Sequence, residues 1–218
     1  YSPTDKPYGY GLFDNVVTNL ELDRILRRRG QPLRPSDDAL PQKIAFIQCV
    51  GSRDAKRGHL WCSKICCGSA LRLAGLIRHR HPQIEVTVFY IDIQTFGKDF
   101  DTVYPMYREG LRFVRAIPGD VLPGEDGRLK VVYAADGTHE GREEVFDLVS
   151  LSIGLTPCTG AGETLSELGI KQAGGGFYPP PETPGVFSAG TVRGPMSIAE
   201  SIADAGRAAM EAAAYLSR

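Results

Sequence analysis

The sequence has no long hydrophobic run and no excess of one charge. Of its 218 residues 42% are hydrophobic, but no apolar run approaches the roughly 20 residues that a membrane-spanning helix needs. The formal net charge is −1, so no overall basic field points to nucleic acid. We therefore expect a globular protein with no nucleic-acid partner and no membrane span.

A secretion signal and an initiator methionine are also absent. The N-terminal stretch YSPTDKPYGYG contains neither the basic nor the apolar region of a signal peptide. We therefore expect a fragment or processed chain from a reducing, cytoplasmic compartment. In such a compartment, clustered cysteines are typical of metal-binding or redox-active sites rather than of a disulfide framework.

The glycine-rich loop of a dinucleotide-binding fold is missing where it would be expected. The apolar run KIAFIQCV, residues 43–50, predicts a buried strand, and it continues into C-V-G-S-R instead of G-x-G-x-x-G. That glycine pattern lets a pyrophosphate approach the N-terminus of the following helix. We infer that the chain does not bind NAD(P)H in the usual manner; the competing interpretation is that Gly51, Ser52 and Arg53 hold a phosphate.

Strands and helices alternate along the sequence. Two capping boxes predict helix starts, Thr18 with Glu21 and Ser197 with Glu200. Further strands are predicted over 85–93, 111–117 and 120–154, the last stretch as a β-meander with Asp-Gly turns, and a helix is predicted over 99–110. Strand, helix, strand, helix, strand and meander together predict an α/β protein with a Rossmann-like three-layer domain over residues 41–150.

Four of the five cysteines lie within nineteen positions. They are Cys49, Cys62, Cys66 and Cys67, in the pattern C-x12-C-x3-C-C. If a helix spans 62–81, Cys62 and Cys66 share one of its faces. The candidates are buried packing residues, a zinc site, an iron–sulfur cluster and a redox dithiol at Cys62 and Cys66. The sequence has no repeated C-x2-C, which favours a cluster over zinc only weakly, and the alternatives stay open.

A second motif lies near the C-terminus. TPGVFSAGT, residues 183–191, precedes a predicted helix and resembles the closing FAD motif of thioredoxin-reductase-like flavoproteins, with Thr191 where those proteins have Asp. A glycine at position 190 allows close approach of the backbone to a ligand, and a helix N-terminus stabilises charge on a flavin edge. The alternative interpretation is an ordinary loop followed by a capped surface helix.

Taken together, the chain resembles the A-type flavoprotein subunits of heterodisulfide reductase and the related subunits of quinone-interacting membrane-bound oxidoreductases. The resemblance covers nearly the whole chain and includes KIAFIQCVGSRD, WCSKICC, FYIDIQTFGKDFD, LSIGLTP and FSAGTVRGPMSIAESIADA. It implies a thioredoxin-reductase-like fold in which a central domain, 41–150, is inserted into an FAD domain. Residues 1–40 and 151–218 would then be parts of that FAD domain, whose own G-x-G-x-x-G is not in this sequence.

The resemblance also implies cofactors and partners. A [4Fe–4S] cluster is expected on Cys49, Cys62, Cys66 and Cys67. FAD is expected to bind at six residues, which are Gly190, Thr191, Pro195, Met196, Ser197 and Ile198. Because the glycine motif is missing, the sequence leaves open whether this chain retains FAD. Expected partners are other subunits of a redox complex and ferredoxin-like or quinone-linked electron carriers, and a homodimer is allowed.

The function expected on this basis is that of an electron-transfer flavoprotein fragment. It would be an oxidoreductase that passes electrons between FAD and the cluster. The expectation does not require that the fragment is active without the rest of the protein. The alternatives are a metal-free dithiol oxidoreductase of the pyridine nucleotide–disulfide type and a zinc-stapled module that docks subunits. The sequence singles out no catalytic residue.

Overall fold

The computed structural model describes residues 2–94, 105–106, 109–134, 140–157, 160, 162–181 and 183–217. These residues form two compact units. The sheet unit comprises Ser2–Val50 and Cys66–Ile153, and the C-terminal unit comprises Gly51–Ile65 and Gly154–Arg218.

A five-stranded parallel sheet forms the centre of the sheet unit, with the strand order β1-β8-β2-β3-β4. The strands are β1 Val16–Thr18, β2 Lys43–Val50, β3 Glu85–Tyr90, β4 Arg112–Arg115 and β8 Leu148–Ile153. The central strands are almost continuously apolar because both faces of a parallel sheet are covered.

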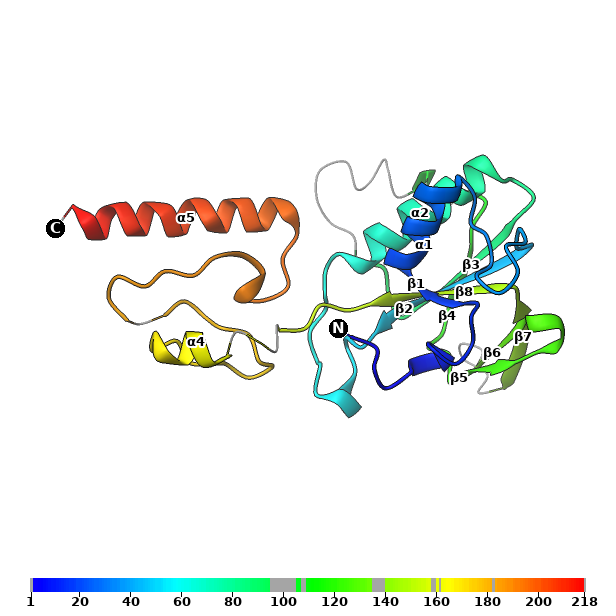
Figure 1. Cartoon of the computed structure of the whole chain (residues 1–218), viewed down its shortest axis with the longest axis horizontal. Helices are drawn as coiled ribbons and strands as arrows, with labels where there is room; N and C mark the ends of the chain where they lie inside the picture. Colours follow the sequence, from blue (N-terminus) through cyan, green and yellow to red (C-terminus); the bar gives the residue numbers. More distant parts are fainter. Residues whose placement is uncertain are drawn as a thin grey trace. The chain divides into compact units, whose positions relative to one another are not determined.

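Helices α1 (Asn19–Arg29) and α2 (Cys66–Arg80) cover one face of this sheet (Figure 1). α1 begins at the predicted capping box of Thr18 and Glu21 and ends at Gly30, which is left-handed. Its buried Leu22 and Leu26 join the core with residues of α2 and the strands. The helix layer is therefore held by apolar packing from two amphipathic helices.

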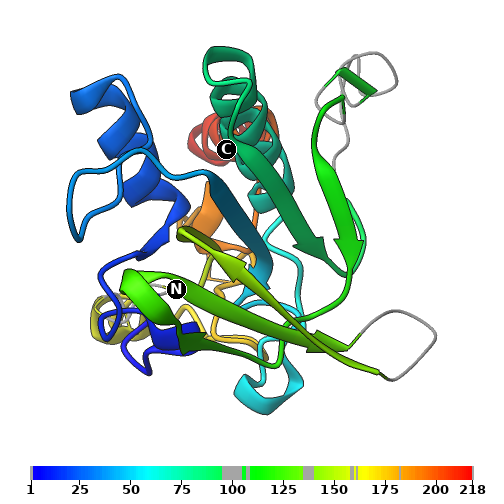
Figure 2. The same ribbon diagram turned by 90° about the vertical axis from the view of Figure 1, so that its right-hand side faces the viewer.

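A three-stranded antiparallel meander covers the other face. It consists of β5 Asp120–Pro123, β6 Leu129–Ala134 and β7 Gly141–Phe146. Phe89 of β3 packs edge-on against Tyr133 and Phe146, with ring centroids 5.0 and 5.9 Å apart. Figure 2 shows the meander and the helices on opposite sides of the parallel strands. The predicted α/β architecture with three layers and a meander is confirmed, but the last strand of the stretch predicted as a meander, β8, pairs instead with β1 and β2 in the parallel sheet.

The C-terminal unit contains α4 (Gly162–Glu167) and α5 (Ile198–Leu216). α5 begins at the predicted capping box of Ser197 and Glu200, and none of its described residues is buried. Among the described residues, no helix is both long enough and apolar enough to cross a membrane.

One predicted element boundary is wrong. The helix expected from residue 62 begins only at Cys66, so Cys62 and Cys66 do not share a helical face. Lys64 has a φ of 64°, a left-handed conformation that interrupts a right-handed helix at this point. A helix expected near 99–110 falls mostly outside the described residues, as does the second Asp-Gly turn. The division into 1–40, 41–150 and 151–218 stays a prediction.

Candidate functional site

The first candidate site lies at the carboxyl end of the parallel sheet, where β2 carries a bulge. The pairing of β2 with β8 shifts register between two steps, Ile47 with Leu151 and Val50 with Ile153. Two residues of β2, Gln48 and Cys49, therefore lie opposite the single residue Ser152. Cys49 has a φ of 60°, and bulges of this kind redirect a side chain at the end of a strand.

Ser152 shows which layer this position faces. The residue is 1% exposed, and its hydroxyl accepts a hydrogen bond of 2.8 Å from Nδ2 of Asn19, at the start of α1. The Asn19 Oδ1 atom in turn accepts 2.8 Å from the Ser150 hydroxyl. Ser152 thus faces the helix layer, and we infer that the bulge brings Gln48 and Cys49 to the same side.

Two further cysteines begin α2. Cys66 is half-buried and its Sγ lies 3.5 Å from the carbonyl oxygen of Ile153, the last residue of β8. Cys67 is 5% exposed. A helix N-terminus favours the thiolate because its backbone N–H groups and dipole stabilise negative charge. Cys49, Cys66 and Cys67 therefore belong to one edge of the sheet unit, the edge at which open α/β sheets bind ligands.

The fourth predicted ligand, Cys62, belongs to the C-terminal unit. Its Sγ accepts a hydrogen bond of 3.3 Å from the backbone N–H of Lys64. Ser63 is 1% exposed, and its hydroxyl accepts 2.7 Å from the backbone N–H of Leu155. Trp61 donates from Nε1 to the Leu155 carbonyl at 2.9 Å. Cys62 therefore lies in an irregular loop that is hydrogen-bonded to the segment following β8.

The four cysteines carry thiols, which is the donor set of an iron–sulfur cluster. In the part of the chain that the structure describes, however, no three His, Cys, Asp or Glu side chains lie close enough to hold a metal ion. The residues therefore fit a cluster by donor type.

The second candidate site is the loop before α5. Gly190 has a φ of 76° and begins a short turn, and its backbone N–H donates 2.9 Å to Oδ2 of Asp204 in α5. This hydrogen bond and the guanidinium groups of Arg193 and Arg207 hold the pKa of Asp204 below its ordinary value. The turn that contains Gly190 is thus anchored to α5 by a charged side chain that sequence reasoning missed.

The start of α5 is tied to the loop that carries Cys62. Glu200 accepts 2.7 Å from the backbone N–H of Ser197, and its other oxygen lies 2.8 Å from Nζ of Lys64. The ammonium of Lys64, with the Ser197 backbone, lowers the pKa of Glu200 to about 2. Within the C-terminal unit, a predicted cluster ligand and the predicted flavin-binding helix start are therefore linked through one ion pair.

Two of the six predicted flavin residues line a cavity of about 210 Å³, Thr191 and Pro195. Its walls come from three segments of the C-terminal unit and consist of Leu155, Thr156, Pro157, Phe177, Tyr178, Thr191, Val192 and Pro195. The backbone N–H of Tyr178 donates to the Val192 carbonyl at 2.9 Å. The other four predicted flavin residues do not line this cavity; they are Gly190, Met196, Ser197 and Ile198. The side chain of Ile198 is 82% exposed. Sequence reasoning missed Phe177 and Tyr178, which no motif distinguishes.

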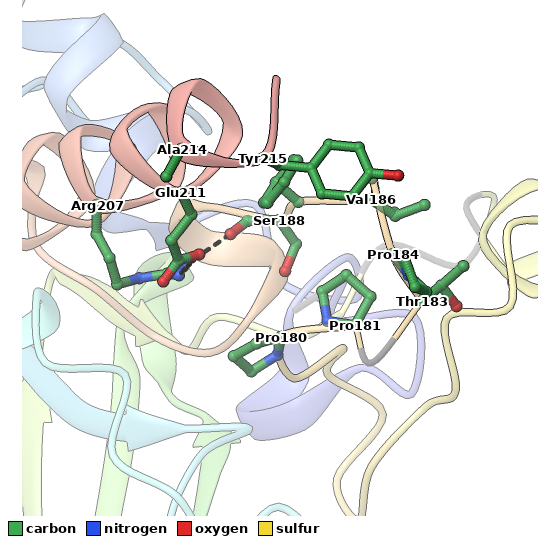
Figure 3. Close-up of a pocket in the computed structure, with 12 residues that line it drawn as sticks. Pro180, Pro181, Thr183, Pro184, Val186, Ser188, Arg207, Glu211, Ala214 and Tyr215 are labelled. Atoms are coloured by element: carbon green, nitrogen blue, oxygen red, sulfur yellow. Dashed lines mark hydrogen bonds and ion pairs between the residues drawn. The ribbon is translucent and has the colours of Figure 1, made fainter. Parts of the chain in front are cut away.

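A larger cavity, about 420 Å³, lies between the last turns of α5 and two stretches of the preceding loop, Pro180–Pro181 and Thr183–Ser188 (Figure 3). Its charged groups already have partners, since Arg207 pairs with Glu211 and donates 3.0 Å to the Ser188 carbonyl. Phe187 and Tyr215 pack edge-on at 6.1 Å. The cavity therefore presents an apolar, proline-rich wall without an available charge among its described residues.

Comparisons with known proteins identify relatives over nearly the whole chain. No family model matches. The chain is 37% identical to an A-type iron–sulfur subunit of the CoB–CoM heterodisulfide reductase of Methanopyrus kandleri, over 98% of the chain and 35% of that protein. It is 38% identical to the corresponding subunit of Methanocaldococcus jannaschii, over 93% of the chain and 33% of that protein. The chain thus spans about a third of these relatives, and the resemblance predicted from the motifs is confirmed.

Solved structures show the same fold class. The thioredoxin reductase of T. acidophilum matches with a TM-score of 0.58 at 14% identity, over 92% of the chain and 57% of its own length. The thioredoxin reductase of Lactococcus lactis matches with a TM-score of 0.57 at 22% identity, over 94% of the chain and 59% of its own length. The L-lysine 6-monooxygenase of Pseudomonas syringae matches with a TM-score of 0.59 at 13% identity, over 99% of the chain and 61% of its own. The chain therefore has a thioredoxin-reductase-like fold.

Proposed function

We propose that this chain is the part of a heterodisulfide reductase A-like oxidoreductase that passes electrons between FAD and a [4Fe–4S] cluster. The observation that carries the proposal is the position of Cys49, Cys66 and Cys67 at the carboxyl edge of the parallel sheet. Relatives named as iron–sulfur A-type subunits support it. Three thiols are an unusual group to place where an open α/β sheet ordinarily binds its ligand.

The proposed cluster ligands are Cys49, Cys62, Cys66 and Cys67. The N-terminus of α2 lowers the cost of ionising Cys66 and Cys67. The backbone N–H of Lys64 donates a hydrogen bond to the Cys62 sulfur. When bound, the cluster supplies one-electron transfer.

FAD is proposed to contact the loop and helix start formed by Gly190, Thr191, Pro195, Met196, Ser197 and Ile198. Asp204 holds the Gly190 backbone, and the capped N-terminus of α5 presents N–H groups that stabilise negative charge on a flavin edge. Thr191 supplies a hydroxyl where the similar motif has a carboxylate, so its contact with the ligand is neutral.

The proposed partners are other subunits of a redox complex and ferredoxin-like or quinone-linked electron carriers. The names of several relatives support this. One is the A-type subunit of a ferredoxin:CoB–CoM heterodisulfide reductase of Methanosarcina acetivorans, 34% identical over 99% of the chain and 32% of that protein. Because the chain spans only about a third of such proteins, the substrate of the whole protein belongs to the same proposal.

Anaerobic reconstitution with iron and sulfide tests the cluster. We expect the wild-type chain to gain a broad visible absorption and, after reduction, an EPR signal. The Cys66→Ser variant should lose most of both because one thiolate ligand is removed. The matched control is Cys158→Ser, which removes the one cysteine outside the proposed set and should behave as wild type.

The outcomes separate the proposal from its rivals. One zinc per chain and no redox activity would favour the subunit-docking module. A reversible Cys62–Cys66 disulfide without metal would favour the dithiol oxidoreductase. Either result would overturn the electron-transfer proposal.

A further inference from the structure

A buried glutamine in β2 lacks hydrogen-bond partners. Gln48 is 6% exposed, and neither Nε2 nor Oε1 of its carboxamide has a partner among the residues that the structure describes. Leaving buried polar groups unpaired is costly, so native structures almost always pair them. A carboxamide in this state points to a partner that the described chain does not supply.

The polar groups on the β8 side of Gln48 hydrogen-bond to one another. Asn19 binds both Ser150 and Ser152 through its two side-chain atoms, at 2.8 Å each. This closed network leaves Gln48 out, although Ser152 lies opposite Gln48 at the bulge. The partner of Gln48 is therefore not in this group of three residues.

Cysteine thiols occupy that edge. Cys49 follows Gln48 directly and shares the bulge, and Cys66 and Cys67 begin α2 above the same face of the sheet. Sulfur atoms of a cluster held by these thiols would be hydrogen-bond acceptors at the same sheet edge, where Cys67 is buried and Cys49 and Cys66 are partly buried. A carboxamide N–H donor is chemically suited to such an acceptor, and hydrogen bonds to sulfur are one of the means by which proteins set cluster potentials.

We propose that Gln48 is a positioning residue that donates from Nε2 to a sulfur atom of the proposed cluster and thereby raises the reduction potential of that cluster. This inference rests on the proposed function. One electron delivered to the cluster from FAD, as the proposed function requires, would make the cluster sulfur atoms more basic, while the amide of Gln48 would keep its proton. The hydrogen bond is therefore stronger in the reduced state, and its loss shifts the equilibrium toward the oxidised state.

The test compares reconstituted wild-type chain with Gln48→Met, which keeps the length of the side chain and removes the donor. Thr87→Val is the matched control. Thr87 is a buried polar residue on β3, the strand next to β2. Its side chain lies on the face of the sheet opposite to that of the core residues Val86 and Val88. EPR-monitored redox titration should show an about tenfold shift toward the oxidised form in Gln48→Met, equal to about 59 mV for one electron. Thr87→Val should titrate as wild type.

Two results of this comparison would overturn the inference. If Gln48→Met retains iron and its potential matches wild type, Gln48 binds water or another group instead. If the wild-type chain takes up no cluster, the proposed function fails together with this inference.

If Gln48→Met does not take up iron, pulsed EPR of the wild-type chain labelled with ¹⁵N in its glutamine side-chain amides decides. We expect a ¹⁵N coupling to the reduced cluster, and its absence refutes the hydrogen bond.

Discussion

Asn19 is predicted to hold the start of α1 to the end of β8 through two buried hydrogen bonds. The change Asn19→Leu fills a similar volume but leaves the hydroxyls of Ser150 and Ser152, residues that are 0% and 1% exposed, without their partner. Each buried hydroxyl that loses its partner costs about 1–3 kcal/mol. We therefore expect Asn19→Leu to lower the free energy of unfolding by about 2–6 kcal/mol.

A triple variant separates this cost from a general packing defect. Asn19→Leu combined with Ser150→Ala and Ser152→Ala removes the stranded hydroxyls together with the amide, so most of the lost stability should return. Urea unfolding followed by circular dichroism measures all three proteins. The reasoning is refuted if Asn19→Leu alone changes stability by less than about 0.5 kcal/mol, or if the triple variant is no more stable than the single one.

Two further changes test the C-terminal unit. Gly175→Ala should destabilise the chain by about 1–2 kcal/mol, because Gly175 has a φ of +90° and an added Cβ would lie 3.0 Å from the Trp61 ring. The fluorescence of Trp61, the only tryptophan in the sequence, should shift. An unchanged emission spectrum and an unchanged melting temperature would contradict this packing. The Glu200 pKa of about 2 lies below its ordinary value of 4.5, so the stabilisation from its pairing with Lys64 is fully present above about pH 4.5 and is lost as the pH falls toward 2. Melting temperatures of wild type and Glu200→Gln should therefore differ above pH 5 and converge on acidification, and a constant difference would show that the ion pair contributes nothing.

Local sequence signals predicted the features that neighbouring residues determine. The helix starts at Thr18 and Ser197 follow from capping boxes whose partners lie three residues away. The predicted strand over 43–50 matches β2 because a short apolar run bounded by turn residues is itself the signal. These elements needed no information about the tertiary fold.

The features that sequence reasoning missed depend on distant partners. The bulge at Gln48 and Cys49 exists only in the pairing with β8, about a hundred positions later in the sequence. The late start of α2 reflects the left-handed Lys64 beside Ser63, whose hydroxyl is held by Leu155. A helical pattern through Cys62 could not reveal either constraint, so the sequence predicted the cysteines as a group but not their division between a loop and a helix.

The most direct test of the account is the iron and acid-labile sulfide content of the chain after anaerobic purification and reconstitution. The account predicts about four irons and four sulfides per chain, as a [4Fe–4S] cluster requires, with both contents falling in Cys66→Ser. One zinc per chain, or a metal-free protein that takes up neither iron nor sulfide, would contradict it.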